Sequence, residues 1–79
     1  MLVDALEHLV RGIVAHPDDV HVTGRALRRG RVLEVQVHPD DLGKVIGRSG
    51  RTAGALRTVV GALSEGRGVR VDFLDPDER

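Results

Sequence analysis

The sequence feature that most limits the fold of this chain is a break of two glycines, Gly47 and Gly50, which enclose Arg48 and Ser49. Glycine lacks a Cβ, so the backbone can turn sharply at such a break and another chain can approach it closely. The apolar residues before the break follow a helical spacing and are Leu42, Val45 and Ile46. Those after it follow the same spacing from a start near Arg51, and are Ala53, Leu56, Val59, Val60 and Leu63. The break therefore predicts two helices joined by a polar turn.

The rest of the chain predicts one further helix and three strands. Residues 2–15 form an amphipathic helix, which His16-Pro17 should end because the residue before a proline leaves the helical region. The apolar residues of that helix are Leu2, Leu6, Leu9, Val10 and Ile13. Residues 20–23 and 33–38 predict an antiparallel hairpin, since the second segment alternates apolar and polar residues. Residues 69–73 alternate in the same way and form the last strand, and Pro39-Asp40-Asp41 begins the helix before the glycines, with carboxylates that can cap it.

This element order indicates an α+β fold in one domain. A crossover through two helices allows the last strand to lie parallel to an earlier one, which gives a three-stranded mixed sheet with the helices on one face. Residues 1–79 are long enough for a single domain, and residues 75–79 read as a flexible acidic tail.

Composition excludes several kinds of site. The chain has no cysteine, so disulfides and thiolate metal sites are absent. It has no apolar run of the length that crosses a bilayer, and its first residues contain acids where a secretory signal would be apolar, so we expect a cytoplasmic protein that does not act at a membrane. The four histidines are scattered, and we expect no metal site and no cofactor.

Charge is distributed unevenly although the formal net charge is zero. Basic residues gather without acids in two places, which are Arg25, Arg28, Arg29 and Arg31 in the hairpin turn and Lys44, Arg48, Arg51 and Arg57 around the glycines. The local field at a patch, not the net charge, attracts a polyanion. The first cluster is equally well explained as a solvated hairpin tip.

The residues around the glycine break are suited to phosphate. The helix that begins there presents unpaired N–H groups and the positive end of its dipole. Lys44, Arg48 and Arg51 add positive charge. A bare pair of glycines three apart usually marks only a tight turn, so the signal depends on its position between two short helices and on these flanking cations.

The segment Gly43-Lys44-Val45-Ile46-Gly47-Arg48-Ser49-Gly50 resembles the V-I-G-x-x-G signature of KH domains, in which the loop clamps four backbone nucleotides. The element order resembles the type II arrangement, and residues 1–74 are similar to the small bacterial KhpA family of stand-alone KH proteins. This resemblance implies a cytoplasmic protein that binds single-stranded RNA, as an RNA chaperone or post-transcriptional regulator. It also implies a homodimer, or a heteromer with a larger KH-containing RNA-binding protein. No catalysis and no small-molecule substrate are implied.

On this reading each residue near the break has a role. The N–H groups of residues 47–50 and the side chain of Arg48 hold phosphates, and Arg67 closes the far side of the groove. The apolar floor under about four bases consists of Val37, Val45 and Ile46. Phe73 is the only aromatic residue among Phe, Trp and Tyr and is assigned to the core, so stacking platforms are absent and one domain should bind weakly.

Two other readings use the same residues. An enzyme reading fails, because the glycine spacing fits neither a nucleotidase phosphate loop nor a dinucleotide fingerprint, and Asp40-Asp41 reads as a helix cap and not as a catalytic pair. A protein-interaction module that keeps the fold but has little nucleic-acid binding remains open. The N-terminal helix, the hairpin and the acidic tail all offer surfaces for such a module. For self-association, the candidate interfaces are the N-terminal helix or the segment 66–73.

Overall fold

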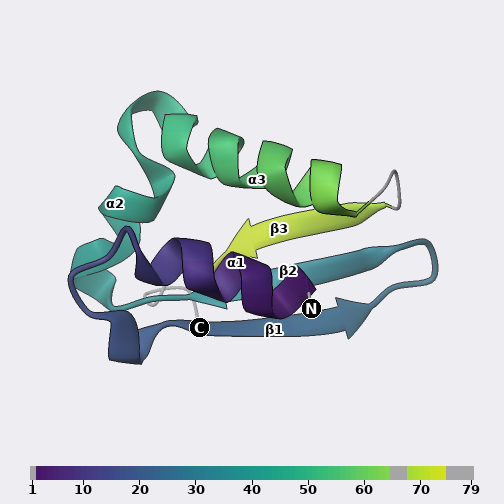
Figure 1. The fold of residues 1–79 in the computed structure, drawn as a ribbon, viewed down its shortest axis with the longest axis horizontal. Coiled ribbons are helices and arrows are strands. Elements are labelled where there is room, and N and C mark those ends of the chain that lie inside the picture. The colour runs from purple at the N-terminus through teal and green to yellow at the C-terminus, as the bar shows by residue number, and fades with distance from the viewer. Residues whose placement is uncertain (1, 65–67, 75–79) are drawn as a thin grey trace.

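The computed structural model describes residues 2–64 and 68–74 and has the predicted element order (Figure 1). Its helices are α1 (Leu2–Arg11), α2 (Leu42–Ile46) and α3 (Arg51–Leu63), and its strands are β1 (His21–Ala26), β2 (Arg31–Gln36) and β3 (Val69–Phe73). Short 3-10 turns occur at Pro17–Asp19, Pro39–Asp41 and Arg48–Gly50. The expected tail, residues 75–79, and the expected groove residue Arg67 lie outside the described residues.

The strands form one mixed sheet in the order β1-β2-β3. β1 and β2 pair antiparallel, from His21 opposite Gln36 to Ala26 opposite Arg31, as the hairpin prediction required. β2 and β3 pair parallel, from Arg31 beside Val69 to Val35 beside Phe73. The crossover that makes this parallel pairing possible contains α2 and α3, so the sheet topology places the glycine break between two helices at one end of the molecule, away from the hairpin tip (Figure 1).

One hydrophobic core lies between the sheet and the helices. Figure 1 shows α1 and α3 side by side against the sheet, and both contribute buried side chains to the same cluster. The buried members of that cluster are Leu6, Val10, Val20, Leu33, Val35, Val37, Val45, Leu56, Val60 and Val71. Phe73 is half-buried and packs against the cluster, so its assignment to the core is confirmed at the edge of it. The period-two pattern of β2 is confirmed too, because Leu33 and Val35 are buried and Gln36 is exposed.

Two predictions about the helices were wrong. α1 ends at Arg11 and not at residue 15, because Gly12 follows, the Ile13 N–H donates to the Val10 carbonyl only three residues back, and the Ala15 N–H donates to the Asp41 carboxylate. Three apolar residues assigned to buried stripes are exposed, which are Ile13, Val59 and Leu63. Ile13 lies beyond the end of α1, and the other two lie beside the buried stripe of α3, which consists of Ala53, Leu56 and Val60 and is narrower than the apolar face of the helix.

Candidate nucleic-acid interface

The four-residue loop Gly47–Gly50 is a tight, ordered turn. Gly47 has φ 77° and ψ 174°, and Gly50 has φ 75° and ψ 15°. Ser49 is the only non-glycine described residue with a positive φ, at 55°. These left-handed conformations fold residues 48–50 into one 3-10 turn between α2 and α3, so the glycine break predicted from the sequence is a defined turn and not an open segment.

The turn uses some of its backbone N–H groups and leaves others unpaired. The Gly47 N–H donates to the Gly43 carbonyl at 2.8 Å, and the Gly50 N–H donates to the Gly47 carbonyl at 3.2 Å. The Arg51 N–H donates to the Arg48 carbonyl. Within the described part of the chain, the N–H groups of Arg48 and Ser49 have no acceptor. We expected all four loop residues to offer donors, whereas the geometry leaves two adjacent ones, on an exposed turn directly before α3.

The cations around the turn differ in how free they are. Arg48 and Arg51 are exposed and make no ion pair or hydrogen bond with any described side chain. The Lys44 ammonium lies 3.7 Å from an oxygen of Asp41 and is 52% exposed. The structure therefore places the three predicted cations on α2, on the turn and on the first residue of α3, with two of them unpaired.

The apolar residues beside the turn divide into buried and exposed ones. Val45 is 0% exposed and Val37 is 5% exposed, so neither offers a surface to a ligand. Ile46 is 38% exposed and is the one residue of the expected floor whose side chain reaches solvent. The prediction that Val45 and Val37 contact bases was wrong, because both side chains belong to the hydrophobic core.

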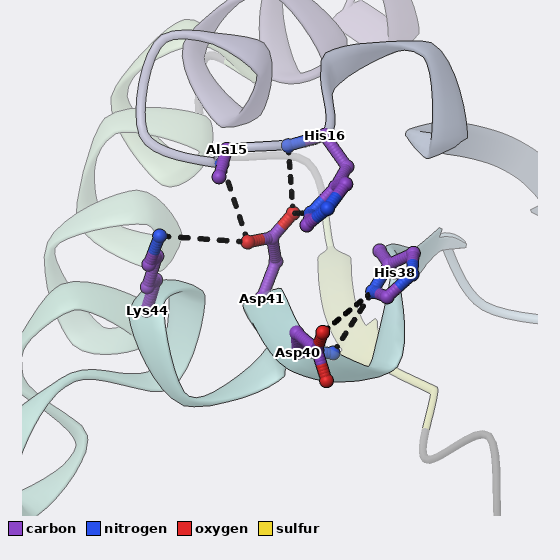
Figure 2. A network of polar contacts seen from close by, with 6 residues as sticks. All are labelled: Ala15, His16, His38, Asp40, Asp41 and Lys44. Atoms are coloured by element: carbon purple, nitrogen blue, oxygen red, sulfur yellow. Dashed lines mark hydrogen bonds and ion pairs between the residues drawn. The ribbon is translucent and has the colours of Figure 1, made fainter.

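A buried carboxylate anchors the start of α2 (Figure 2). Asp41 is 0% exposed, and its carboxylate accepts hydrogen bonds from the Ala15 N–H at 3.2 Å and from the His16 N–H at 2.9 Å. The His16 Nδ1 lies 2.9 Å from the same carboxylate and donates to it. Asp41 therefore joins the loop after α1 to the helix that leads into the glycine turn. The expected capping role was wrong, because the Asp41 carboxylate caps no helix. At the turn before α2, the Asp40 N–H donates to the Nδ1 of His38 and not to a carboxylate.

Two histidine rings stack next to this carboxylate. The rings of His16 and His38 lie 4.0 Å apart with 15° between their planes. The histidines were predicted to be scattered. The pairing of His16 with His38 could have been suspected from the sequence, because the tetrapeptide His-Pro-Asp-Asp occurs at residues 16–19 and again at 38–41. Each copy forms a 3-10 turn that the histidine precedes, and the fold brings the two copies together.

The contacts of Asp41 also set the pH dependence of this anchor. Burial by itself raises the pKa of Asp41, but hydrogen bonds from the His16 ring and from the N–H groups of Ala15 and His16 outweigh burial and hold the pKa below its ordinary value. A carboxyl whose pKa is lowered by folding stabilises the protein above its unfolded pKa of about 3.9. That stabilisation is lost as the pH falls through the folded pKa.

We therefore expect Asp41→Asn to lower the thermal midpoint at pH 7 by roughly 10 °C. Asparagine presents an N–H₂ group to a donor where the carboxylate presents an acceptor. The difference from wild type should narrow as the pH falls from about 4 toward the lowered folded pKa, because the unfolded chain binds a proton there first and the folded carboxyl becomes protonated only at lower pH. Circular dichroism melts between pH 7 and pH 2.5 measure this, with the exposed Asp40→Asn as the control. A difference that stays constant across the range would contradict the role of the ionised carboxylate.

Among the described residues there is neither a membrane-spanning helix nor a cluster of metal ligands. In residues 2–64 and 68–74, no helix has the length and apolar character that crossing a bilayer requires. The same residues contain no group of three or more histidine, aspartate or glutamate side chains placed to hold a metal ion.

Comparison with known proteins gives concordant matches. The family described as "KhpA/KhpB, KH domain" matches residues 3–73. The chain is 77% identical to the RNA-binding protein KhpA of Streptomyces coelicolor over 98% of this chain and 96% of the relative. It is 65% identical to the protein of the same name from Mycobacterium tuberculosis over 99% and 96%, and 49% identical to that of Halalkalibacterium halodurans over 89% and 95%. No solved structure matches the chain significantly.

Proposed function

Because the chain belongs to the KhpA/KhpB family of KH domains, which is an RNA-binding family and not one of enzymes, we propose that it binds single-stranded RNA at the turn Gly47–Gly50. The observation that carries the proposal is the pair of unpaired N–H groups at Arg48 and Ser49, on an exposed turn with a free arginine. Two adjacent donors with a cation beside them are the groups that an RNA phosphate requires.

The turn binds the RNA backbone through charge and hydrogen bonds together. One phosphate accepts from the N–H groups of Arg48 and Ser49 and lies at the positive end of the dipole of the 13-residue helix α3. The Arg48 guanidinium can engage the same phosphate, or the next one, with two parallel hydrogen bonds. Arg51 and Lys44 add charge on either side. These contacts place the strand without reading its sequence.

The bases then lie over the exposed part of α2 and along α3 toward β3. Ile46 offers its apolar surface to one base, and Val45 and Val37 keep the helix in place from the core. Arg67 is proposed to close the far side of the groove. Because the only aromatic side chain of the Phe, Tyr and Trp class is half-buried Phe73, we expect an affinity on the order of micromolar or weaker for a single domain.

Weak binding by one domain makes assembly part of the proposed function. Two copies on one RNA, or one copy joined to a larger KH-containing protein, gain affinity through effective concentration. Such an assembly would act in the cytoplasm as an RNA chaperone or post-transcriptional regulator of many transcripts. A second candidate function, a protein-interaction module with little RNA binding, is favoured by one observation, which is that Val59 and Leu63 expose apolar surface one turn apart on α3.

The test is a titration of fluorescent ten-nucleotide RNA at several salt concentrations, read by anisotropy. We expect the affinity to fall with salt, and Arg48→Ala to weaken binding and to reduce the magnitude of the log–log salt slope by about 0.7, the value of one phosphate contact to a single strand. Arg70→Ala is the matched control, because this exposed arginine pairs with Asp72. Its neighbours Val69 and Val71 face the core, so Arg70 lies on the face of the sheet that is turned away from the helices. Absence of binding by the wild type even at low salt would favour the protein-interaction module.

A further inference from the structure

Arg57, in the middle of α3, is held by two contacts that reach across to β3. Its Nε donates a hydrogen bond to the Val71 carbonyl at 3.3 Å. Its guanidinium carbon lies over the ring of Phe73, 5.4 Å from the ring centre. The side chain is exposed, yet these contacts fix its plane in the way that a cation–π pair and a hydrogen bond do together. Neither contact was predicted from the sequence, which only placed Arg57 in a basic cluster.

The contact to Val71 shows on which side of β3 this arginine lies. The Gly68 carbonyl and the Leu74 N–H both bond to β2, so even-numbered residues of this strand direct their backbone groups toward the sheet. Odd-numbered residues, Val71 among them, therefore direct theirs toward the unpaired edge, since backbone groups alternate along a strand and β3 is the last strand of the sheet. Arg57 thus lies between α3 and the free edge of β3.

Arg57 is also aligned with the turn that we propose as the phosphate site. It follows Gly50 by seven residues, which is two helical turns, so both positions lie on one side of α3 about 10 Å apart. That distance corresponds to about three nucleotides of a stacked strand at about 3.4 Å each. Nothing crowds the neighbouring positions of the helix, because a Cβ added at Gly54 or at Gly61 would meet no atom within 4 Å.

The two contacts leave the base-reading part of the guanidinium available. Nε is used by Val71 and one face of the plane is used by Phe73. The two Nη atoms have no partner among the described residues, and they present a pair of donors side by side. Such a pair fits two adjacent acceptors, which guanine offers as O6 and N7 and single-stranded cytosine offers as O2 and N3. On their Watson–Crick and Hoogsteen edges, adenine and uracil offer no two adjacent acceptors, because the adenine amino group lies next to N1 and N7 and the uracil N3–H lies between O2 and O4.

We propose that Arg57 reads one base of the bound strand and selects guanine or cytosine over adenine and uracil. The inference rests on the proposed function, because it needs single-stranded RNA bound along α3. Phe73 and the Val71 carbonyl hold the guanidinium before RNA arrives, so little conformational entropy is lost when the base is bound.

The experiment compares four RNA ten-mers, decauridine and its variants with one central guanosine, cytidine or adenosine. We expect wild-type protein to bind the guanosine variant, the cytidine variant or both about fivefold to tenfold more tightly than decauridine and the adenosine variant. This preference is at the lower end of the range for a bidentate pair, because the site is exposed. The separate guanosine and cytidine arms show which of the two bases it is. Arg57→Lys keeps the charge but not the paired donors, so all four RNAs should bind within about twofold of one another. Arg70→Lys should keep the wild-type preference.

Direct observation of the side chain gives a second measurement that does not depend on a variant. The Arg57 Nε–Hε signal in a ¹⁵N spectrum should shift with the preferred RNA and less with decauridine. No base preference in the wild type, an unchanged preference in Arg57→Lys, or no shift of this signal would each overturn the proposal. If instead Arg57→Lys removes the preference while Arg48→Ala changes neither affinity nor salt slope, the phosphate site is wrong and the base reader stands.

Discussion

A variant that carries both Arg48→Asp and Ser49→Asp is expected to bind single-stranded RNA about 100-fold more weakly than wild type, or not at all. It places two carboxylates beside the two unpaired N–H groups of the turn and removes the free guanidinium. A phosphate that approaches these donors then meets like charge at close range. The fold should survive, because both side chains are exposed and aspartate tolerates the left-handed conformation that Ser49 adopts at φ 55°.

The matched control introduces the same charge change elsewhere. Arg28 and Arg29 lie at the exposed tip of the hairpin, in the other basic cluster, so Arg28→Asp with Arg29→Asp adds two acids and removes two arginines without touching the turn. Anisotropy titrations with a ten-nucleotide RNA, after circular dichroism has shown both variants to be folded, compare the two. If the hairpin variant loses binding and the turn variant keeps it, the basic hairpin is the binding site and the assignment of the turn is wrong.

The parts of the fold that were predicted correctly are those determined by local periodicity. The alternation in β2 and the helical spacing in α3 each follow from how one segment meets the core, and both were read from the sequence. The glycine turn was located for a similar reason, because two glycines between apolar runs restrict the local backbone. The parallel pairing of β3 was expected as an arrangement that a crossover through two helices allows, and it is observed.

The parts that were missed depend on contacts between distant segments. Asp41 was interpreted as a cap because its neighbours in sequence begin a helix, whereas its partners Ala15 and His16 lie 26 and 25 residues away. Val45 and Ile46 share one apolar run, and only packing decides that the first is buried and the second exposed.

The hydrogen-bond donors of the turn depend on dihedral angles that the sequence does not state. Gly47 and Gly50 turn their N–H groups inward, to carbonyls of α2 and of the turn itself, so they are no longer available to a ligand. The N–H groups of Arg48 and Ser49 are left free by the same geometry. The identity of the loop could be predicted from its residues, but which of its backbone groups a phosphate can reach required the structure.

The two glycines of the turn should respond very differently to alanine. A Cβ on Gly47 would collide with the Thr52 Oγ1 and lie 2.9 Å from the Thr52 N, and φ at this position is 77°. Backbone atoms at the start of α3 cannot move aside as a flexible side chain can, so α2 and α3 must separate. We expect Gly47→Ala to destabilise the protein by about 3 kcal/mol or more, a large part of the stability of a domain of this size, and to abolish RNA binding by deforming the turn. Urea denaturation followed by circular dichroism measures the loss.

Gly50→Ala tests whether RNA needs the space beside the turn, in a variant that is expected to remain folded. A Cβ there would meet no atom of the protein within 4 Å, and the left-handed backbone alone costs about 1–2 kcal/mol. The variant should therefore stay folded at 25 °C. If RNA lies against the turn as proposed, the added methyl group occupies space that the sugar-phosphate backbone needs, and affinity should fall about tenfold in a protein that is still intact. Wild-type affinity in folded Gly50→Ala would mean that the ligand does not approach this side of the turn, and the phosphate site would then have to lie on the Lys44 side.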